Sequence, residues 1–437
     1  MIFTTFKDIS NHPNGLATLF FTELWERFSY YGMRAILVLY LISETNSDNP
    51  GMGWSNAEAI KLYGWYTALV YIACIPGGFI ADKYLSNKNA VILGGGLLCF
   101  GHISLAISNH FFFFSGLILI ILGVGLLKPS ISSLVGNLYK KNDIQRDQGF
   151  TIFYIGINFG AFFASLIVGY IGEIYGWHYG FSLAGFGMIL GQLVFLRGSK
   201  KFPSQIKKKH STKKIKFNFS PVEKDRIKLI SLASLILIIF WASFEQAGGL
   251  MNIFAFEKTD RNLYFINWEI PASWFQSINP LLIILLGLYI SGFWLFLQKK
   301  KIISSSIFKI AIGIIVMGLG FIFMFFASVE AQIFGKSSMY WLVLAYLFHT
   351  VGELCASPVI LSFITKLSPK KLITSIMGIY FAAIGTGNKF AGLIGQYSEK
   401  LGEQVIFLSI TIICIIVGSL VILFHKKIHR LSHGVDN

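Results

Sequence analysis

The sequence is poor in charged side chains and in cysteine. Only 13% of its 437 residues are Asp, Glu, Lys or Arg, whereas 54% are hydrophobic, and the mean hydropathy is +0.64. So much apolar surface with so little charge excludes a disordered chain and is typical of a polytopic membrane protein. The four cysteines lie far apart inside apolar stretches. We therefore expect small core residues there, with neither a disulfide framework nor a metal site.

Several motifs are also missing. The sequence contains no HExxH, no serine nucleophile elbow and no paired aspartates suited to proteolysis, which argues against an intramembrane enzyme. No short cleavable signal stands at the start: residues 1–15 are polar, and the next apolar run is long enough to span a bilayer. We expect that run to be retained as a helix, and we expect a protein that is not an enzyme and has no cofactor.

Twelve hydrophobic spans are present, and their loops differ sharply in charge. On one side of the predicted membrane lie 27 of the 37 Lys and Arg residues, on the other side five, and within the spans another five. The positive-inside rule then places both termini and the long central loop in the cytoplasm. This topology explains the net charge of +16 without a nucleic-acid partner. The predicted spans are 17–42, 60–82, 89–108, 111–137, 147–173, 180–197, 227–256, 274–298, 305–328, 339–365, 373–395 and 403–424.

A basic loop divides the spans into two sets of six. We predict an N-terminal bundle (1–198), a cytoplasmic linker (199–226) and a C-terminal bundle (227–437). This plan, and the stretch GFIADKYLSNK (78–88), resemble the major facilitator superfamily. The alternative is an arrangement of inverted five-helix repeats, which predicts a broken first span, but that span lacks a Gly or Pro break. The expected fold is an all-α membrane protein with twelve helices in two six-helix bundles.

The first span carries four charges: Glu23, Glu26, Arg27 and Arg34. One charge at the bilayer centre costs roughly 2.5–3.5 kcal/mol, so this helix must turn its charged face to a protein interior or a wet cavity. Three further charged groups lie at membrane depth on other spans, namely Lys128, Glu245 and Glu353. They either form fixed salt bridges or, for the carboxylates, exchange protons near neutral pH.

The stretch ELWERFSYYGMR (23–34) resembles the ExxERFxYYG signature of the proton-dependent oligopeptide transporter (POT) family. Further stretches resemble that family's motifs in order along the chain: GVGLLKPSISSLVGN (123–137), FTIFYIGINFGAF (150–162), FWASFEQAGG (240–249), WFQSINP (274–280), GELCASP (352–358) and MGIYF (377–381).

The resemblance implies roles for particular side chains. Arg34 would hold a peptide carboxylate with Lys128 close by, and Glu353 with Asn158 and Asn279 would engage the amino end and the backbone. The remaining pocket residues would be Tyr30, Tyr71, Tyr154, Trp241, Phe244, Ser357 and Tyr380. Glu23, Glu26 and Arg27 would form the proton-coupling cluster, with Glu245 as a second protonation site. In the substrate-free protein we expect Arg27, Arg34 and Lys128 to pair with Glu23, Glu26 and Glu245.

The sequence also departs from the family pattern. Tyr380 stands where the family usually has tryptophan, and Asn137 replaces the usual acidic residue at the end of span 4. The extra helical pair that many bacterial members insert between the halves is absent, so twelve spans are expected instead of fourteen.

The expected function is proton-coupled import of di- and tripeptides by alternating access. We expect a monomer in a bacterial inner membrane, with protons as the coupling ion and the lipid bilayer as its surroundings. Uptake of nitrate or of another small anion or amino-acid-like solute is the alternative, although a bare anion offers Glu353 nothing to bind. A non-transporting membrane sensor is a further possibility.

Overall fold

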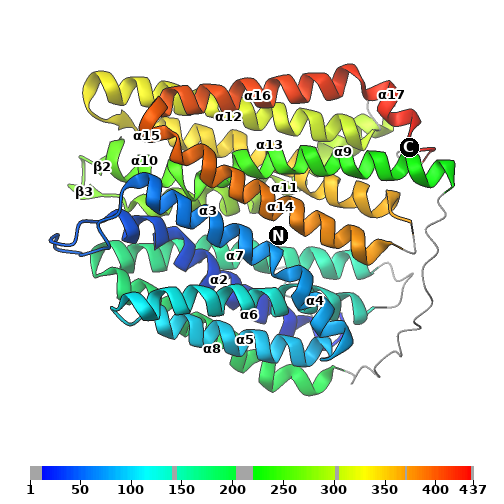
Figure 1. Cartoon of the computed structure of the whole chain (residues 1–437), viewed down its shortest axis with the longest axis horizontal. Coiled ribbons are helices and arrows are strands. Elements are labelled where there is room, and N and C mark those ends of the chain that lie inside the picture. The colour runs from blue at the N-terminus through cyan, green and yellow to red at the C-terminus, as the bar shows by residue number, and fades with distance from the viewer. Residues whose placement is uncertain (1–11, 140–144, 203–219, 301–304, 370–371, 435–437) are drawn as a thin grey trace. The chain divides into compact units, whose positions relative to one another are not determined.

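The computed structural model describes residues 12–139, 145–202, 220–300, 305–369 and 372–434, and these are almost entirely helical (Figure 1). Ten helices in this part of the chain are long and apolar enough to cross a membrane. The helix α2 (Leu16–Ile42) is not among the ten, because its hydropathy is interrupted by four charged residues. Each of the twelve predicted spans consists mainly of helix, although the second and the seventh are interrupted.

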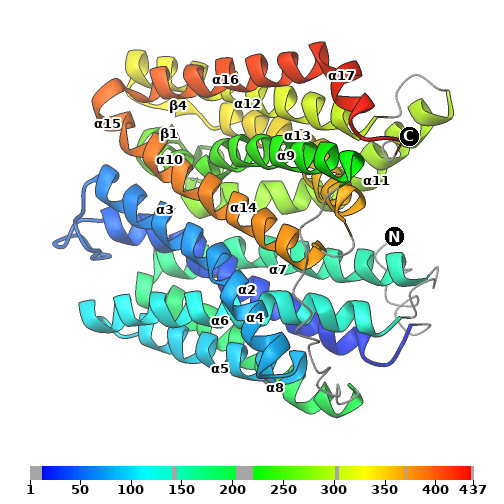
Figure 2. The ribbon, with the colours of Figure 1, turned by 45° about the vertical axis from the view of Figure 1, so that its right-hand side comes forward.

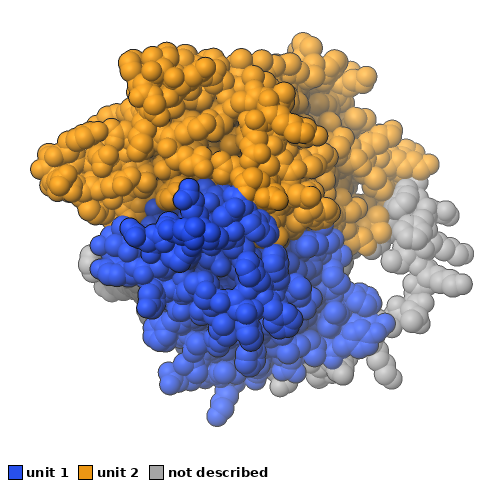
Figure 3. Space-filling view, turned by 60° about the vertical axis from the view of Figure 1, so that its left-hand side comes forward, with its two compact units in different colours: residues 1–54, 69–211 blue, residues 55–68, 212–437 orange. Residues whose placement is uncertain are grey.

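The chain forms two compact units, shown in Figure 3. Unit 1 comprises residues 1–54 and 69–211, and unit 2 comprises residues 55–68 and 212–437. The helix α3 (Asn56–Ile72) is therefore divided between them. Most of the predicted linker, residues 203–219, lies outside the described residues.

Unit 1 is built around α2, which packs against two other long helices of the same unit, α7 (Gln145–Ile174) and α8 (Trp177–Gly198). The other helices are α4 (Cys74–Lys83), α5 (Asn87–Leu105) and α6 (His110–Asn137), with a 3₁₀ turn η1 (Ser199–Lys201) after α8. The helices α5 and α6 pack closely along their length. Contact between α4 and α6 requires glycine, because a Cβ at Gly77 would lie 2.1 Å from the carbonyl oxygen of Gly125.

The second predicted span is broken into α3 and α4 at Ala73. Pro76 explains the break: its ring displaces the carbonyl four residues earlier, that of Ile72, and it has no N–H to donate. α3 ends at Ile72. Two other prolines, Pro129 in α6 and Pro358 in α13 (Tyr340–Leu367), lie inside continuous helices.

Unit 2 contains the remaining long helices, α9 (Pro221–Phe244), α11 (Ile278–Lys299), α12 (Ser306–Phe334), α13, α14 (Ile373–Gln396) and α16 (Glu403–Leu423). α12 lies beside both α13 and α16, and α9 lies beside α14 (Figures 1 and 2). The short elements are η2 (Glu245–Ala247), α10 (Leu250–Lys258), η3 (Ala272–Ser277), α15 (Ser398–Leu401) and α17 (His425–Arg430).

The seventh span differs from its prediction in two respects. Its helix begins at Pro221, not at 227, because Ser220 and Glu223 form a capping box and Pro221 occupies the first helical turn. The predicted continuous helix is also interrupted, since η2 and the pair Gly248–Gly249 separate α9 from α10. Glycine carries the largest entropic cost in a helix, and two in succession permit this interruption.

In the described part of unit 2, four short strands lie in the loops. β1 (Thr259–Asp260) pairs with β4 (Ser337–Ser338) in parallel, and β2 (Asn262–Leu263) pairs with β3 (Trp268–Glu269) in an antiparallel hairpin. Tyr264 donates a hydrogen bond of 2.8 Å to Asp260, which lowers the pKa of the Asp260 carboxyl below its usual value.

Candidate functional site

The charges of α2 form a buried cluster in unit 1. Arg27 is 3% exposed and lies between two carboxylates. Glu26 accepts hydrogen bonds from both Nε and Nη2 of Arg27, the second at 2.5 Å, whereas Glu23 makes one contact, from Oε1 to Nε at 3.2 Å. The other oxygen of Glu23, Oε2, is buried and has no hydrogen-bond partner among the described residues. The two carboxylates are therefore bound unequally.

Two tyrosines of α2 accompany its arginines. The Arg27 guanidinium lies 5.1 Å from the ring centroid of Tyr30, and that of Arg34 lies 5.0 Å from the ring of Tyr31. Since α2 places residues three and four apart on one face, the helix itself aligns these groups. Aromatic faces lower the cost of keeping cations away from water.

Lys128 of α6 differs from its expected state. Its Nζ lies 3.9 Å from the ring centroid of Tyr71, on α3, and across the described residues it makes no ion pair. The expected pairing of Lys128 with a carboxylate is thus wrong. The aromatic ring offers a partly negative face, worth about 2 kcal/mol when water is excluded, and leaves the charge of the ammonium group uncancelled.

The other predicted residues of unit 1 lie on α7. Asn158 is buried and donates to the carbonyl of Tyr154, one turn earlier, at 3.0 Å. The Tyr154 side chain is itself exposed. The amide oxygen of Asn158 remains available for other contacts, and the structure assigns it no role toward a ligand.

In unit 2, Glu245 lies at the start of η2, where α9 ends. It is 2% exposed and accepts a hydrogen bond of 2.8 Å from the hydroxyl of Tyr63. The partner expected from the sequence was a cation, and Tyr63 was not among the predicted site residues. Gly248 makes this hydrogen bond possible: a Cβ there would lie 2.0 Å from the Tyr63 hydroxyl oxygen. Gly248, which lies in the break of the seventh span, therefore leaves the space that the Tyr63 hydroxyl occupies.

Glu353 is held by a hydrogen-bonded group on α11 and α13. Asn279 donates from Nδ2 to Glu353 Oε2 at 2.9 Å and to Thr350 Oγ1 at 3.1 Å. Thr350 is buried and donates its own proton to the carbonyl of Tyr346 at 2.7 Å, so its oxygen can only accept from Asn279. The sequence interpretation missed Thr350, although its position three residues before Glu353 places both on one helix face.

Aromatic side chains from α9 stand next to Glu245 in the sequence and form a small cluster. The rings of Phe240 and Phe244 stack at 5.9 Å, and Trp241 meets Phe244 edge-on at 5.4 Å. Tyr380 on α14 is buried and its ring lies 5.7 Å from that of Phe381. Ser357 on α13 is half-buried.

The Tyr63–Glu245 contact provides a stability prediction. Tyr63→Phe removes the hydrogen bond to a buried carboxylate, and Gly248→Ala forces the hydroxyl away from it. Each variant is expected to lose about 1–3 kcal/mol of unfolding free energy, observed as a lower melting temperature in detergent. Gly249→Ala is the matched control, since a Cβ there would meet Tyr63 only at an ordinary 3.7 Å. Equal melting of Gly248→Ala and Gly249→Ala would contradict this interpretation.

Two histidines to which the sequence analysis assigned no role are buried in the structure. His102 is fully buried on α5 and bonds Ser29 at 2.6 Å, while His349 on α13 packs against the Phe321 ring at a centroid distance of 4.4 Å. Neither histidine lies in a metal-ligating group: in the described ranges, no cluster of three or more His, Cys, Asp or Glu side chains could hold a metal ion.

Fold and buried charges together define a multi-pass helical membrane protein whose ionisable groups lie on the inward faces of its helices, an arrangement typical of solute transporters. Comparison with known proteins makes the class specific. The sequence profile of the POT family matches residues 88–234 and 222–412. The chain belongs to this family of membrane transporters, and its fold is of the major facilitator type.

Two characterised relatives are similar along almost their whole length. A peptide transporter of Yersinia enterocolitica is 36% identical, with 97% of this chain and 96% of the relative aligned. A di-/tripeptide transporter of Lactococcus lactis subsp. cremoris is also 36% identical, with 99% of each chain aligned.

Solved structures similar to this chain also belong to POT transporters. A peptide transporter POT in complex with alafosfalin superposes with a TM-score of 0.89 at 33% identity, covering 97% of this chain and 96% of that one. A POT family transporter in complex with 5-aminolevulinic acid gives a TM-score of 0.88 at 30% identity, covering 95% and 97%.

Proposed function

We propose that this protein is a symporter that imports di- and tripeptides together with protons by alternating access. The relatives named as peptide and di-/tripeptide transporters support the substrate class. Support also comes from the ligands of the similar structures: alafosfalin is peptide-like, and 5-aminolevulinic acid has an amino group and a carboxylate.

The observation that carries the proposal is the unequal charge of the two clusters. The cluster of unit 1 contains three cations (Arg27, Arg34, Lys128) and two carboxylates (Glu23, Glu26), so it has one positive charge in excess when all are ionised. In unit 2, the corresponding groups are the carboxylates Glu245 and Glu353, hydrogen-bonded to a hydroxyl and an amide. A zwitterionic peptide complements both signs.

In this proposal Arg34 and Lys128 bind the peptide carboxylate. Arg34 offers a planar fork suited to two hydrogen bonds, and Lys128 offers a point charge that makes no ion pair in the described residues. Glu353 binds the ammonium group, with Asn279 oriented for it by Thr350. Tyr30, Tyr71, Tyr154, Asn158, Trp241, Phe244, Ser357 and Tyr380 are proposed to line the site.

We assign the coupled proton to Glu23 in preference to Glu26. Protonating Glu26 would disrupt two hydrogen bonds to Arg27, whereas protonating Glu23 affects one contact and gives its unpartnered oxygen a proton to donate. A neutral Glu23 leaves the positive charge of Arg27 less compensated, which favours binding of an anionic group nearby. Glu245 remains a second candidate for protonation.

The proposed location is a bacterial inner membrane, with both termini and the basic loop in the cytoplasm, because most Lys and Arg residues fall on that side. Transport is proposed to need no cofactor besides the proton, and the functional unit is proposed to be a monomer.

The experiment that tests the substrate class is uptake of labelled dialanine into proteoliposomes under an acid-outside gradient. Unlabelled dipeptide and tripeptide are expected to compete, whereas nitrate and free alanine are not. Competition by nitrate alone would support the anion transporter instead, and binding of dialanine without uptake would identify a sensor.

A further inference from the structure

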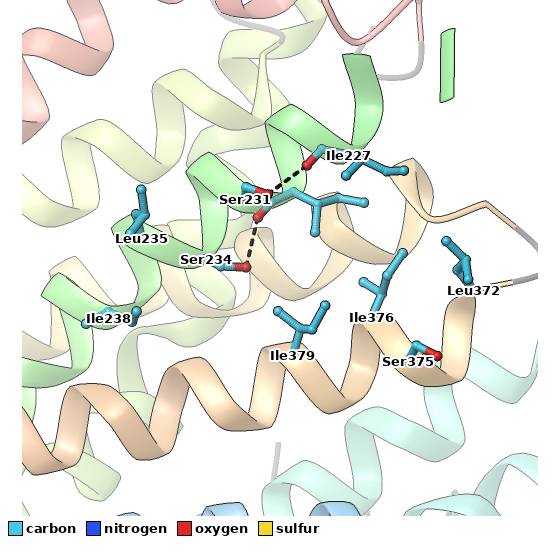
Figure 4. A pocket seen from close by; sticks show the side chains of 10 residues that line it. Ile227, Ser231, Ser234, Leu235, Ile238, Leu372, Ser375, Ile376 and Ile379 are labelled. Atoms are coloured by element: carbon cyan, nitrogen blue, oxygen red, sulfur yellow. Dashed lines mark hydrogen bonds between the residues drawn. The ribbon is translucent and has the colours of Figure 1, made fainter. Parts of the chain in front are cut away.

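A groove runs along unit 2 between α9 and α14 (Figure 4). Its volume is about 560 Å³, in the range of small-molecule sites. Six residues of α9, three of α14 and Leu372 just before α14 line it, and Leu235 and Ile379 on its walls are 60% and 50% exposed. The lining residues are Ile227, Ile230, Ser231, Ser234, Leu235, Ile238, Leu372, Ser375, Ile376 and Ile379.

The wall of the groove is apolar although three serines contribute to it. Ser231 donates to the carbonyl of Ile227 at 3.1 Å, and Ser234 donates to that of Ile230 at 2.8 Å, so both hydroxyl protons are used within α9 (Figure 4). Branched aliphatic side chains supply most of the remaining surface. Such a wall favours a hydrocarbon chain over any polar ligand.

The length of the groove suits one acyl chain. From Ile227 to Ile238 the helix rises about 16 Å, which is close to half of a hydrocarbon core of about 30 Å. The groove begins near the first turns of both α9 and α14, so it lies in the leaflet next to the N-terminal ends of these helices. In the proposed topology this is the cytoplasmic leaflet, and the inference rests on the proposed function in that respect alone.

A lysine lies one turn before the apolar wall of the groove on α9. Lys224 lies three residues before Ile227 and seven before Ser231, on the same face of α9, and makes no ion pair in the described part of the chain. The neighbouring Lys228, by contrast, is paired with Asp225 at 3.0 Å. The N-terminal end of α14 adds the positive end of its dipole here, whereas at α9 the carboxylate of Glu223 caps the helix end.

We propose that this groove is a binding site for an anionic phospholipid, with one acyl chain between α9 and α14 and the phosphate at Lys224. Charge complementarity to Lys224 selects the occupant, because a zwitterionic lipid would bring an ammonium group close to this lysine. The lipid fills a cavity in the wall of unit 2 that protein atoms leave open.

The test is native mass spectrometry of the full-length protein with phosphatidylglycerol or phosphatidylcholine of identical chains. The unaltered protein should retain one phosphatidylglycerol about five-fold more strongly than phosphatidylcholine. This is the preference expected of one lysine near an anionic headgroup. Lys224→Gln should abolish this preference and Lys228→Gln, its matched control, should keep it. Ser375→Phe, which fills the groove from its exposed side, should remove the bound lipid.

Ser291→Phe on α11, equally exposed and outside the groove, should retain the lipid and shows that a new aromatic ring is tolerated. Equal retention of both lipids by the unaltered protein, or retention unchanged in Lys224→Gln and Ser375→Phe, would overturn the proposal. None of these measurements depends on transport, so failure of the lipid site and failure of peptide uptake are separate outcomes.

Discussion

The variant Glu23→Gln is expected to abolish proton-driven accumulation of dialanine while preserving exchange of dialanine across the membrane. In the structure Glu23 has one oxygen on Arg27 and the other without a partner in the described residues, and for this reason we propose that Glu23 takes up the coupled proton. Glutamine keeps the shape and mimics the neutral state, so the peptide still binds but no proton moves with it.

The size of the effect follows from the driving force. A proton motive force of 100 mV supplies about 2.3 kcal/mol per charge, equivalent to roughly a fifty-fold concentration ratio. In Glu23→Gln proteoliposomes this ratio should fall to about one. Counterflow, measured with labelled peptide outside and unlabelled peptide inside, should continue.

Glu44→Gln is the matched control, because Glu44 is an exposed glutamate in the loop that follows α2. It should accumulate dialanine as the unaltered protein does. Accumulation retained in Glu23→Gln would show that the coupled proton is carried elsewhere, and Glu245→Gln would then be examined in the same assay.

The second large effect is expected at Glu353. Glu353→Gln removes the negative charge that we propose binds the peptide ammonium group, while the amide can still accept from Asn279. Hydrogen bonds to charged groups contribute about 1.5–3 kcal/mol, so the affinity for dialanine should fall roughly 10- to 150-fold. The affinity for N-acetyl-dialanine, which has no ammonium group, should hardly change.

Binding of both ligands can be measured by isothermal calorimetry on purified protein. Glu330→Gln provides the control, since Glu330 belongs to the same unit but bonds the backbone of Ser338 and the indole of Trp341. Equal losses for dialanine and N-acetyl-dialanine in Glu353→Gln would contradict an ammonium-binding role.

Much of the fold could be predicted from the sequence because its strongest signal is hydropathy. An apolar run long enough to cross a bilayer is expected to form a helix. In the hydrocarbon core no water is present, so the backbone N–H and C=O groups must form hydrogen bonds within the segment, as they do in a helix. The first span shows the limit of hydropathy alone: its charges remove α2 from the apolar helices, and only their placement on one face identifies it as a buried span.

Local details depended on signals that hydropathy does not carry. The start of α9 at Pro221 follows from a capping box that can be read in the sequence as SPVE. The break at Gly248 could be suspected from the paired glycines, but the close contact of Gly248 with the Tyr63 hydroxyl could not, because Tyr63 lies 185 positions away in the sequence. Contacts between residues so far apart in the sequence cannot be predicted from local sequence patterns.

The sequence singled out the charged residues of the candidate site, but it did not predict all of their pairings. The charged groups of α2 combine as expected, because Glu23 and Arg27 are one turn apart. Lys128 faces Tyr71 instead of a carboxylate, and Glu245 meets a tyrosine hydroxyl. Each buried charge had several possible partners of opposite charge in the sequence. Only the distances in the structure show which of these groups are in contact.

The most direct test of proton-coupled peptide transport is substrate-driven proton movement. Purified protein would be reconstituted into liposomes that contain a pH-sensitive dye and are clamped at zero membrane potential, and dialanine would be added outside. We expect acidification of the lumen that depends on dialanine, is absent with N-acetyl-dialanine and is lost in Glu23→Gln. Uptake of dialanine with no change in luminal pH would contradict it.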